Sequence, residues 1–380
     1  MNSEEKLYSI ALSIISSPAH NKIWDYIYTS HPSEIYNRIE GKNKLRVQGF
    51  ISAKYKGEPF EAARAIYDHA ISQSIKMIDF WDRDYPPLLK EINKPPLLLY
   101  YKGHLNTSRS LAIVGTRNND KKSSQVTRRI SSELSKLGFT IISGMAIGID
   151  REAHLGALQS NGSTIGVLAN GIGIIYPSFN RDLYTAILST DNSSLVSEYP
   201  PDVFAGKWTF VRRNRIISGL SLGTIVIKAG MNSGALITSR YAIEQNREVF
   251  ACPGLAFDEE YSGCHNLIKN GAVLVSSTED ILRELPISND IQTSLNALEF
   301  ENRSEDISNR KVFVDENNLK GEFKEDSIER KILNLLTDGD KDMDSVVRLI
   351  DCNTSEANKA ILMLELSGEI TRDGNRISKS

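Results

Sequence analysis

Three turns of small residues and one cluster of arginines are the parts of this chain best suited to chemistry with an anion. The turns are Gly115-Thr116-Arg117, Ser143-Gly144 and Ser233-Gly234, and the cluster is Arg212-Arg213-Asn214-Arg215. A small-residue turn ahead of a helix exposes backbone N–H groups at the positive end of the helix dipole, which favours phosphate. Arginine adds a planar fork of donors that matches phosphate oxygens. We therefore predict a phosphate-binding site. Its candidate residues are Gly115, Thr116, Arg117, Ser143, Gly144, Arg212, Arg213, Asn214, Arg215, Ser233 and Gly234.

The arginine cluster has two interpretations. A run of charges is usually the solvated face of a helix, and on a helix Arg212 and Arg215 would lie near one face while Arg213 turns elsewhere. Here apolar residues interleave with the run, and the segment Lys207-Trp208-Thr209-Phe210 precedes it. Aromatic rings beside cations can stack nucleic-acid bases. The aromatic residues therefore favour a phosphate-contacting role over a plain charged face.

Residues arranged for catalysis or metal binding are not evident. Asp150 and His154 stand four apart and would share a helix face, so an acid–base pair or a metal site is conceivable. Aspartate is a favoured helix N-cap, however, and no third ligand is evident, so we interpret Asp150 as a cap. The histidines are scattered, and no G-x-S-x-G or H-E-x-x-H pattern occurs. The sequence predicts a binding protein with no catalytic residues, no metal and no cofactor.

Composition limits the setting of such a site. The 45 Lys and Arg residues face 48 Asp and Glu, a net charge of −3, so a nucleic-acid site must be a local patch. The hydrophobic fraction of 40% is sufficient for packed domains. Three cysteines in unrelated contexts argue against a disulfide framework and against structural zinc. With no leader peptide and no apolar run of about 18 residues, we expect a soluble cytoplasmic protein without a membrane partner.

A regular alternation of strands and helices positions the candidate residues. One predicted helix carries Val126, Ile130, Leu134 and Leu137 on one face and ends at Gly138. Such alternation predicts an α/β fold with a doubly wound, mostly parallel sheet. Ligands bind these sheets beyond the carboxyl ends of the strands, where the candidate turns lie. The predicted strands, apolar runs typical of burial on both faces, are 111–115, 140–144, 164–169, 195–199, 224–229, 249–253 and 272–276.

The chain divides into four regions by pattern and composition. Residues 1–80 have helical periodicity and predict a helical module of the SAM or helix-hairpin-helix kind. Prolines between 84 and 99 predict an irregular strap leading into the α/β domain, residues 81–286. Residues 287–326 are polar without periodicity and predict a flexible linker. Residues 327–380, with three amphipathic segments and a hairpin, predict a winged helix-turn-helix whose acidic helices favour protein contact or weak DNA contact.

The order of the motifs carries more information than any one of them. They are Val114-Gly115-Thr116-Arg117, the 143–150 loop, Ala153-His154, Tyr176-Pro177, Arg213-Asn214-Arg215-Ile216-Ile217, Ser233-Gly234-Ala235-Leu236-Ile237-Thr238, Pro253-Gly254, Leu267-Ile268 and Gly271-Ala272. As an ordered set they resemble the DNA-processing protein A family, also called DprA or Smf. The resemblance covers roughly residues 80–285 and, more loosely, the C-terminal module.

The resemblance implies an extended Rossmann-like domain that binds single-stranded DNA. It also implies a homodimer that protects incoming DNA and loads the recombinase RecA during natural transformation. On this basis Arg117 and the arginines of 212–215 line a basic pocket for the DNA backbone, and the amides of Gly115, Ser143 and Gly144 donate to phosphates. The chain departs from the family pattern at Ile147, Gly173, Ser178, Lys228 and His265. These departures leave the path of the DNA open.

Two other functions are compatible with the same pattern. The first is a nucleotide-binding or nucleotide-hydrolysing enzyme or sensor, because related Rossmann-like sheets hold small nucleotides. The second is a regulator that acts mainly through the winged helix-turn-helix.

Overall fold

The structure is a computed structural model that describes most of the chain. The described residues are 3–15, 19–41, 45–49, 51, 55, 57–285, 327–337, 339–350, 352, 356–357, 360–361, 364, 369–373 and 376–379. The chain forms two compact units, Met1–Gln292 and Thr293–Ser380. No helix in the described part of either unit is both long and apolar enough to span a bilayer.

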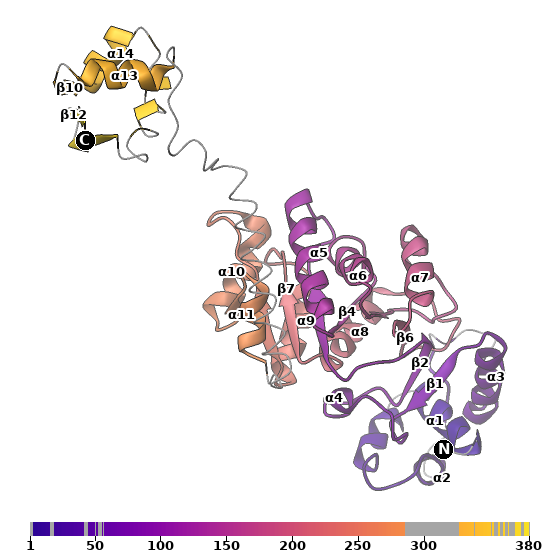
Figure 1. Ribbon diagram of the computed structural model, residues 1–380. Coiled ribbons are helices and arrows are strands. Elements are labelled where there is room, and N and C mark those ends of the chain that lie inside the picture. Colours follow the sequence, from indigo (N-terminus) through magenta and orange to yellow (C-terminus); the bar gives the residue numbers. More distant parts are fainter. Residues whose placement is uncertain are drawn as a thin grey trace. The chain divides into compact units, whose positions relative to one another are not determined.

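A nine-stranded sheet forms the centre of the first unit (Figure 1). The strand order is β1-β2-β6-β5-β4-β3-β7-β8-β9, and every neighbouring pair from β6 to β9 is parallel, which confirms the predicted α/β fold. The strands are β1 Lys76–Asp79, β2 Leu98–Gly103, β3 Ser110–Val114, β4 Thr140–Ser143, β5 Thr164–Val167, β6 Ser194–Ser197, β7 Gly223–Val226, β8 Glu248–Ala251 and β9 Val273–Leu274.

Strands β1 and β2 are an antiparallel addition at one edge of the sheet. The prediction of an irregular strap over residues 84–99 was wrong at its end, because Leu98 and Leu99 already belong to β2. The four residues of β1 are too few for the alternating pattern that identifies a strand. β2 depends on pairing with β6, and β1 on pairing with β2, and no local signal in the sequence points to either pairing.

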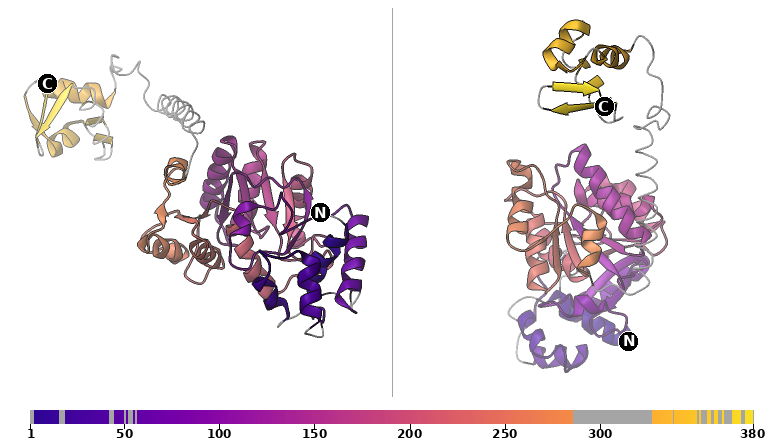
Figure 2. Two further views of the ribbon diagram at one scale, coloured as in Figure 1. Left: turned by 90° about the horizontal axis from the view of Figure 1, so that it is seen from below. Right: turned by 60° about the vertical axis from the view of Figure 1, so that its left-hand side comes forward.

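Helices flank the sheet on both faces (Figure 2). Helix α5 packs on α6 and α6 on α7, whereas α8 packs on α9. Gly138 has a φ of +84° immediately after the end of α5, as predicted, but Val126 is exposed, because serine and threonine side chains fill part of the buried face of α5. These helices are α5 Lys121–Lys136, α6 Ile149–Gln159, α7 Arg181–Leu188, α8 Lys207–Gly219, α9 Ala235–Glu244, α10 Ser262–Lys269 and α11 Thr278–Arg283, with 3₁₀ turns η3 Ser178–Asn180 and η4 Glu259–Tyr261.

The N-terminal helices share one hydrophobic core with the sheet. Lys6 on the first helix forms ion pairs with Asp79 and Asp82, at 2.6 and 2.5 Å. The helices predicted for residues 1–80 are present. Strand β1 lies within that range and joins the sheet of the following domain, and the domain boundary at residue 80 stays a prediction. The elements are α1 Ser3–Ile14, η1 Ala19–Asp25, α2 Pro32–Glu40, α3 Pro59–Ser72 and α4 Pro87–Lys90.

The second unit has its own small apolar core and a three-stranded antiparallel sheet of order β10-β12-β11. Two helices and a terminal hairpin occur where they were predicted. Most of the third predicted helix, 354–367, and the linker predicted over 287–326 lie outside the described residues. Identification of the unit as a winged helix-turn-helix stays a prediction. Its elements are α13 Ile328–Leu336, β10 Lys341–Asp342, α14 Met343–Ile350, β11 Ile370–Asp373 and β12 Arg376–Lys379.

Candidate nucleic-acid interface

The loops that follow the carboxyl ends of the parallel strands, here called the crown, bring most of the predicted residues together. Strands β4, β5 and β6 lie on one side of β3, and β7, β8 and β9 on the other, so the chain changes direction between β3 and β7. Ligands of open α/β sheets bind at this type of switch point. A cleft of about 980 Å³ lies there, between Thr116 and Arg117 after β3 and residues 230–234 after β7.

Two crown loops interlock through their glycines. The amide of Ile149 donates to the carbonyl of Thr116 at 3.1 Å. A Cβ on Gly115 would lie 2.6 Å from the Ile149 side chain, and a Cβ on Gly148 would lie 2.4 Å from the Thr116 oxygen. These glycines are therefore required for close contact between the two loops, before any role in phosphate binding. The contact fixes the position of Arg117.

Asp150 holds the loop after β4 from inside. Its Oδ2 accepts hydrogen bonds from the amides of Gly144 and Ala146, at 3.1 and 3.4 Å. Burial raises the pKa of this carboxyl, and Arg213 and the two amides oppose the rise. The predicted role as helix cap was wrong, because Gly148 is the N-cap of α6 and Asp150 lies within the first turn. The Gly144 amide expected to donate to phosphate is thus engaged within the protein.

Arg213 is buried beneath the same loop. Its Nη1 donates to the carbonyl oxygens of Gly144 and Val167, and its Nε donates to Asn214 at 3.2 Å. Burial lowers the pKa of this guanidinium to about 10. Ser143 is also buried, and its hydroxyl donates to the carbonyl of Ile113 at 2.6 Å. Arg213 and Ser143 therefore support the crown from below.

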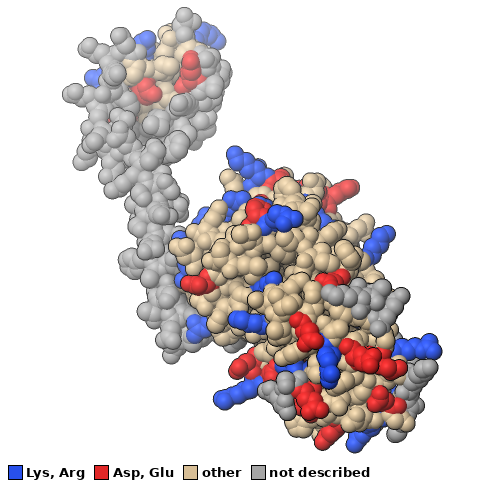
Figure 3. Space-filling model, turned by 90° about the vertical axis from the view of Figure 1, so that its right-hand side faces the viewer, with Lys and Arg blue, Asp and Glu red and all other residues tan. Residues whose placement is uncertain are grey.

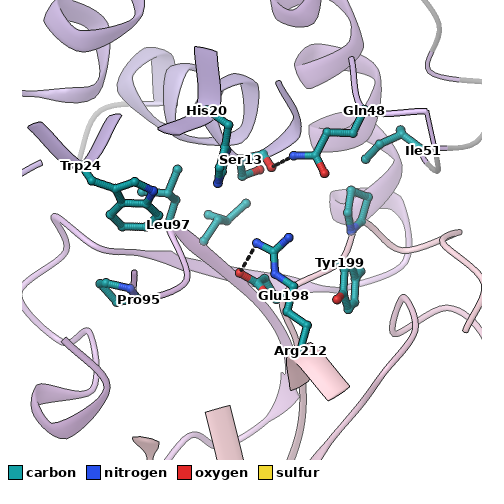
Figure 4. A pocket seen from close by; sticks show the side chains of 12 residues that line it. Ser13, His20, Trp24, Gln48, Ile51, Pro95, Leu97, Glu198, Tyr199 and Arg212 are labelled. Atoms are coloured by element: carbon teal, nitrogen blue, oxygen red, sulfur yellow. Dashed lines mark hydrogen bonds and ion pairs between the residues drawn. The ribbon is translucent and has the colours of Figure 1, made fainter. Parts of the chain in front are cut away.

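Arg212 and Arg215 both pair with Glu198, which follows β6. Figure 4 shows the pair of Arg212 with Glu198. The Glu198 side chain is only 10% exposed, and Arg215 is similarly buried, whereas Arg212 keeps 34% of its side chain exposed. Although burial acts against it, the two guanidiniums hold the pKa of Glu198 below its ordinary value. Glu198 was not identified from the sequence, where a single glutamate after an apolar run gives no sign of burial.

Arg117 differs from the other arginines of the site because it is exposed. Among the described residues no carboxylate lies within ion-pair distance of its guanidinium, which stands 5.4 Å from the ring centre of Phe210. Arg117 lines the 980 Å³ cleft and two further pockets of about 220 and about 130 Å³. Asn214 and Gly234 line the second pocket with it, and Ser233 lines the cleft.

Aromatic rings form one wall of the pocket of about 130 Å³ beside Arg117. Tyr176 and Phe210 both line it, with ring centres 5.8 Å apart. Phe210 was noted in the sequence as a possible stacking residue, and Tyr176 only as part of a motif. The pocket adjoins Arg117, so a cation and two rings lie side by side.

The opposite rim of the cleft is acidic. Lys228, buried two residues after the end of β7, pairs with Asp120 at 2.7 Å and with Glu260 at 2.6 Å. Burial acts to lower the pKa of Lys228, but these two carboxylates raise it overall. Glu259 and Glu260 line the cleft itself. One ammonium therefore faces more than one carboxylate, and this rim repels phosphate.

Charge is otherwise mixed over the surface. Figure 3 shows acidic and basic side chains interspersed on one face of the first unit, without a large patch of either sign. Within the described residues no cluster of three or more His, Cys, Asp or Glu side chains is arranged for a metal ion. His154 is buried with its Nδ1 2.7 Å from the Thr164 hydroxyl, and burial lowers its pKa to about 3.

An open, mostly parallel sheet with a free arginine and small-residue turns at its switch point defines a Rossmann-like α/β protein built to hold an anionic ligand. Residues 76–286 match the family described as DNA recombination-mediator protein A, and the chain belongs to this family. The match confirms the resemblance seen in the motifs and the class of recombination mediator.

Relatives of known name cover much of the chain. The DNA processing protein DprA of Bacillus subtilis is 44% identical over 57% of this chain and 73% of its own length. The protein of that name from Streptococcus pneumoniae is 42% identical over 56% of this chain and 75% of its own length. The X-ray structure of DNA processing protein A from Streptococcus pneumoniae has a TM-score of 0.61 and 33% identity, and the similarity covers 75% of this chain and 99% of that one.

Proposed function

We propose that this protein binds single-stranded DNA across the crown, with a backbone phosphate at Arg117 and a base beside Tyr176 and Phe210. The observation that carries the proposal is the position of Arg117, an exposed cation that lines three adjoining pockets at the switch point. A guanidinium in this position can meet a phosphate while an adjoining pocket receives part of the same nucleotide.

The wall of aromatic rings favours an unpaired strand. A base in a duplex is stacked and paired, so its face is not available to Tyr176 or Phe210. A single strand presents its bases, and base–aromatic stacking tolerates any sequence. The pocket of about 130 Å³ lies directly beside Arg117, so phosphate and base contacts are available to one nucleotide.

The predicted site residues divide into two groups in this proposal. Arg117, Thr116, Asn214, Ser233 and Gly234 line cavities and meet the strand, and Gly115 sets the turn that presents them. The buried groups position this surface, and Arg212 contributes at its margin. The buried residues are Ser143, Gly144, Arg213 and Arg215.

The proposal extends to handover of the strand. The family is described as a recombination mediator, and relatives are named DNA processing proteins, which supports protection of incoming DNA and loading of RecA during natural transformation. We include a homodimer, a cytoplasmic location and a role without substrate turnover in the same proposal. His154 fits a role without turnover, because its ring is buried in the core and faces Thr164.

Fluorescence anisotropy with labelled oligothymidylate tests the proposal. Arg117→Ala should weaken binding by about tenfold to about 100-fold, the effect of losing a hydrogen bond to a charged group. The slope of log affinity against log salt should also become shallower, because fewer counterions are released. Arg283→Ala, which removes an exposed arginine from α11, is the control. Equal, salt-insensitive binding by wild type and Arg117→Ala would overturn the proposal.

A further inference from the structure

Phe179 is an exposed aromatic side chain with a defined orientation. It lies in the 3₁₀ turn η3, and 71% of the residue is exposed. The guanidinium of Arg151 lies 5.4 Å from the centre of its ring and covers part of it. A ring exposed to this extent contributes little to the core, and its face is accessible to a ligand.

The surroundings of Phe179 hold the ring in place. The buried side chain of Asn180 donates to the carbonyls of Met145 and Ala146, at 2.9 and 3.3 Å. Arg151 donates to Asn180 at 3.0 Å and is also paired with Asp182. Because Asp182 neutralises Arg151, the site offers a ring face rather than a free positive charge.

The order of the strands places Phe179 in line with Arg117. The loops after β3, β4 and β5 are neighbours on the crown, and they carry Arg117, Ala146 and Phe179 in that order. Two strand spacings amount to about 10 Å. About three nucleotides span this distance, since a stacked strand rises about 3.4 Å per nucleotide. Ala146 and Tyr176 line the pocket beside Arg117, so the surface is continuous in this direction.

The other direction is unfavourable to a polyanion. Beyond Arg117, on the side of β7 and β8, the cleft is lined by Glu259 and Glu260. Their carboxylates repel phosphates, and Lys228 is already paired with Glu260 and Asp120. A strand anchored at Arg117 therefore contacts Ser233 and Gly234 only at the anchoring nucleotide and continues from there toward β5.

We propose that Phe179 is a second base-stacking site, about three nucleotides from the phosphate at Arg117, and that the strand runs across the crown from β3 toward β5. The inference rests on the proposed single-strand binding and adds a direction and a second contact to it. Stacking on an exposed ring is sequence-tolerant and contributes roughly five- to 100-fold in affinity per base.

Anisotropy with labelled oligothymidylates of graded length, from two to about 16 nucleotides, tests the inference. Phe179→Ala should bind the longer oligonucleotides roughly five- to 100-fold more weakly and the dinucleotide as wild type does. Tyr28→Ala is the matched control, because Tyr28 is 69% exposed and lies among the N-terminal helices, away from the crown. Phe179→Trp should keep the affinity, and stacking should quench the fluorescence of the new indole.

An abasic nucleotide separates stacking from a structural effect. Scanned along the oligonucleotide, it should weaken wild-type binding at one position and make no difference there for Phe179→Ala. Binding by Phe179→Ala equal to that of Tyr28→Ala, or the same abasic profile in wild type and Phe179→Ala, would overturn the second site. If Arg117→Ala still weakens binding in that case, the proposed function stands alone. If wild type binds none of the oligonucleotides, both proposals fail.

Discussion

The guanidinium of Arg213 lies directly against Gly144, so that a Cβ at residue 144 would stand 2.6 Å from both terminal nitrogens. The same guanidinium donates to the carbonyl of Gly144, and to that of Val167 on β5. The small residue after β4 is therefore required by a buried cation of the protein itself. This contact joins α8 to the crown loop that follows β4.

Gly144→Ala tests this contact. The added methyl group should displace Arg213 from its two carbonyl partners and lower the free energy of unfolding by about 1–3 kcal/mol, as overpacking in a core does. Urea denaturation measures the change. Gly49→Ala is the control, because a Cβ there meets nothing within 4 Å. Equal stability of the two variants would show that Arg213 relocates without loss.

Glu198→Gln removes the charge shared by Arg212 and Arg215. Two guanidiniums would then lack their buried carboxylate, and the free energy of unfolding at pH 7 should fall by about 3–5 kcal/mol. Because the folded-state pKa of Glu198 is lowered, its stabilisation is complete above the unfolded pKa, about 4.3, and is lost as the pH falls through the lower folded value. The difference between wild type and variant should therefore narrow below about pH 4.3. A difference that stays constant with pH would contradict the assignment.

Two buried histidines should make the stability of the fold depend on pH in a second range, above the range in which Glu198 acts. Burial lowers the pKa of His154 to about 3 and that of His20 to about 4, so both stay neutral in the folded protein while the unfolded chain takes up protons below about 6.5. Stability should fall as the pH drops from 6.5 toward 4, by up to about 1.4 kcal/mol per pH unit for each group.

Urea denaturation between pH 7 and pH 4.5 measures this effect. His154→Gln should show a shallower loss of stability over that range than wild type. His104→Gln, which replaces an exposed histidine, should keep the wild-type slope. Identical slopes for all three proteins would show that His154 is protonated in the folded state.

The strands of the sheet and the turns of the crown could be predicted from the sequence because each depends on a local pattern of residues. Apolar runs of the length of a buried strand, followed by small residues, identify β3 and β4 and the turns after them without knowledge of any partner. The burial of Arg213 and Arg215 is not local. The burial of Arg213 depends on Gly144, and that of Arg215 depends on Glu198, and both partners are distant in the chain. A run of arginines has the same sequence pattern whether it faces solvent or a carboxylate. Phe179 was missed for a similar reason, since its exposure depends on where η3 packs.

Glu260→Gln should strengthen binding of single-stranded DNA. Glu260 lines the cleft beside Arg117, and its carboxylate lies 2.6 Å from Lys228, which also pairs with Asp120. Removing this charge lowers the repulsion of phosphate while Asp120 still neutralises Lys228, so the fold should be retained. We expect affinity to rise about two- to fivefold at low salt, the range of a partly exposed charge interaction, and the gain to shrink as salt screens it. Glu244→Gln, an exposed glutamate at the end of α9, controls for net charge. Anisotropy that gives equal gains for both variants would assign the effect to overall charge, and weaker binding by Glu260→Gln would contradict an acidic rim that directs the strand away from β8.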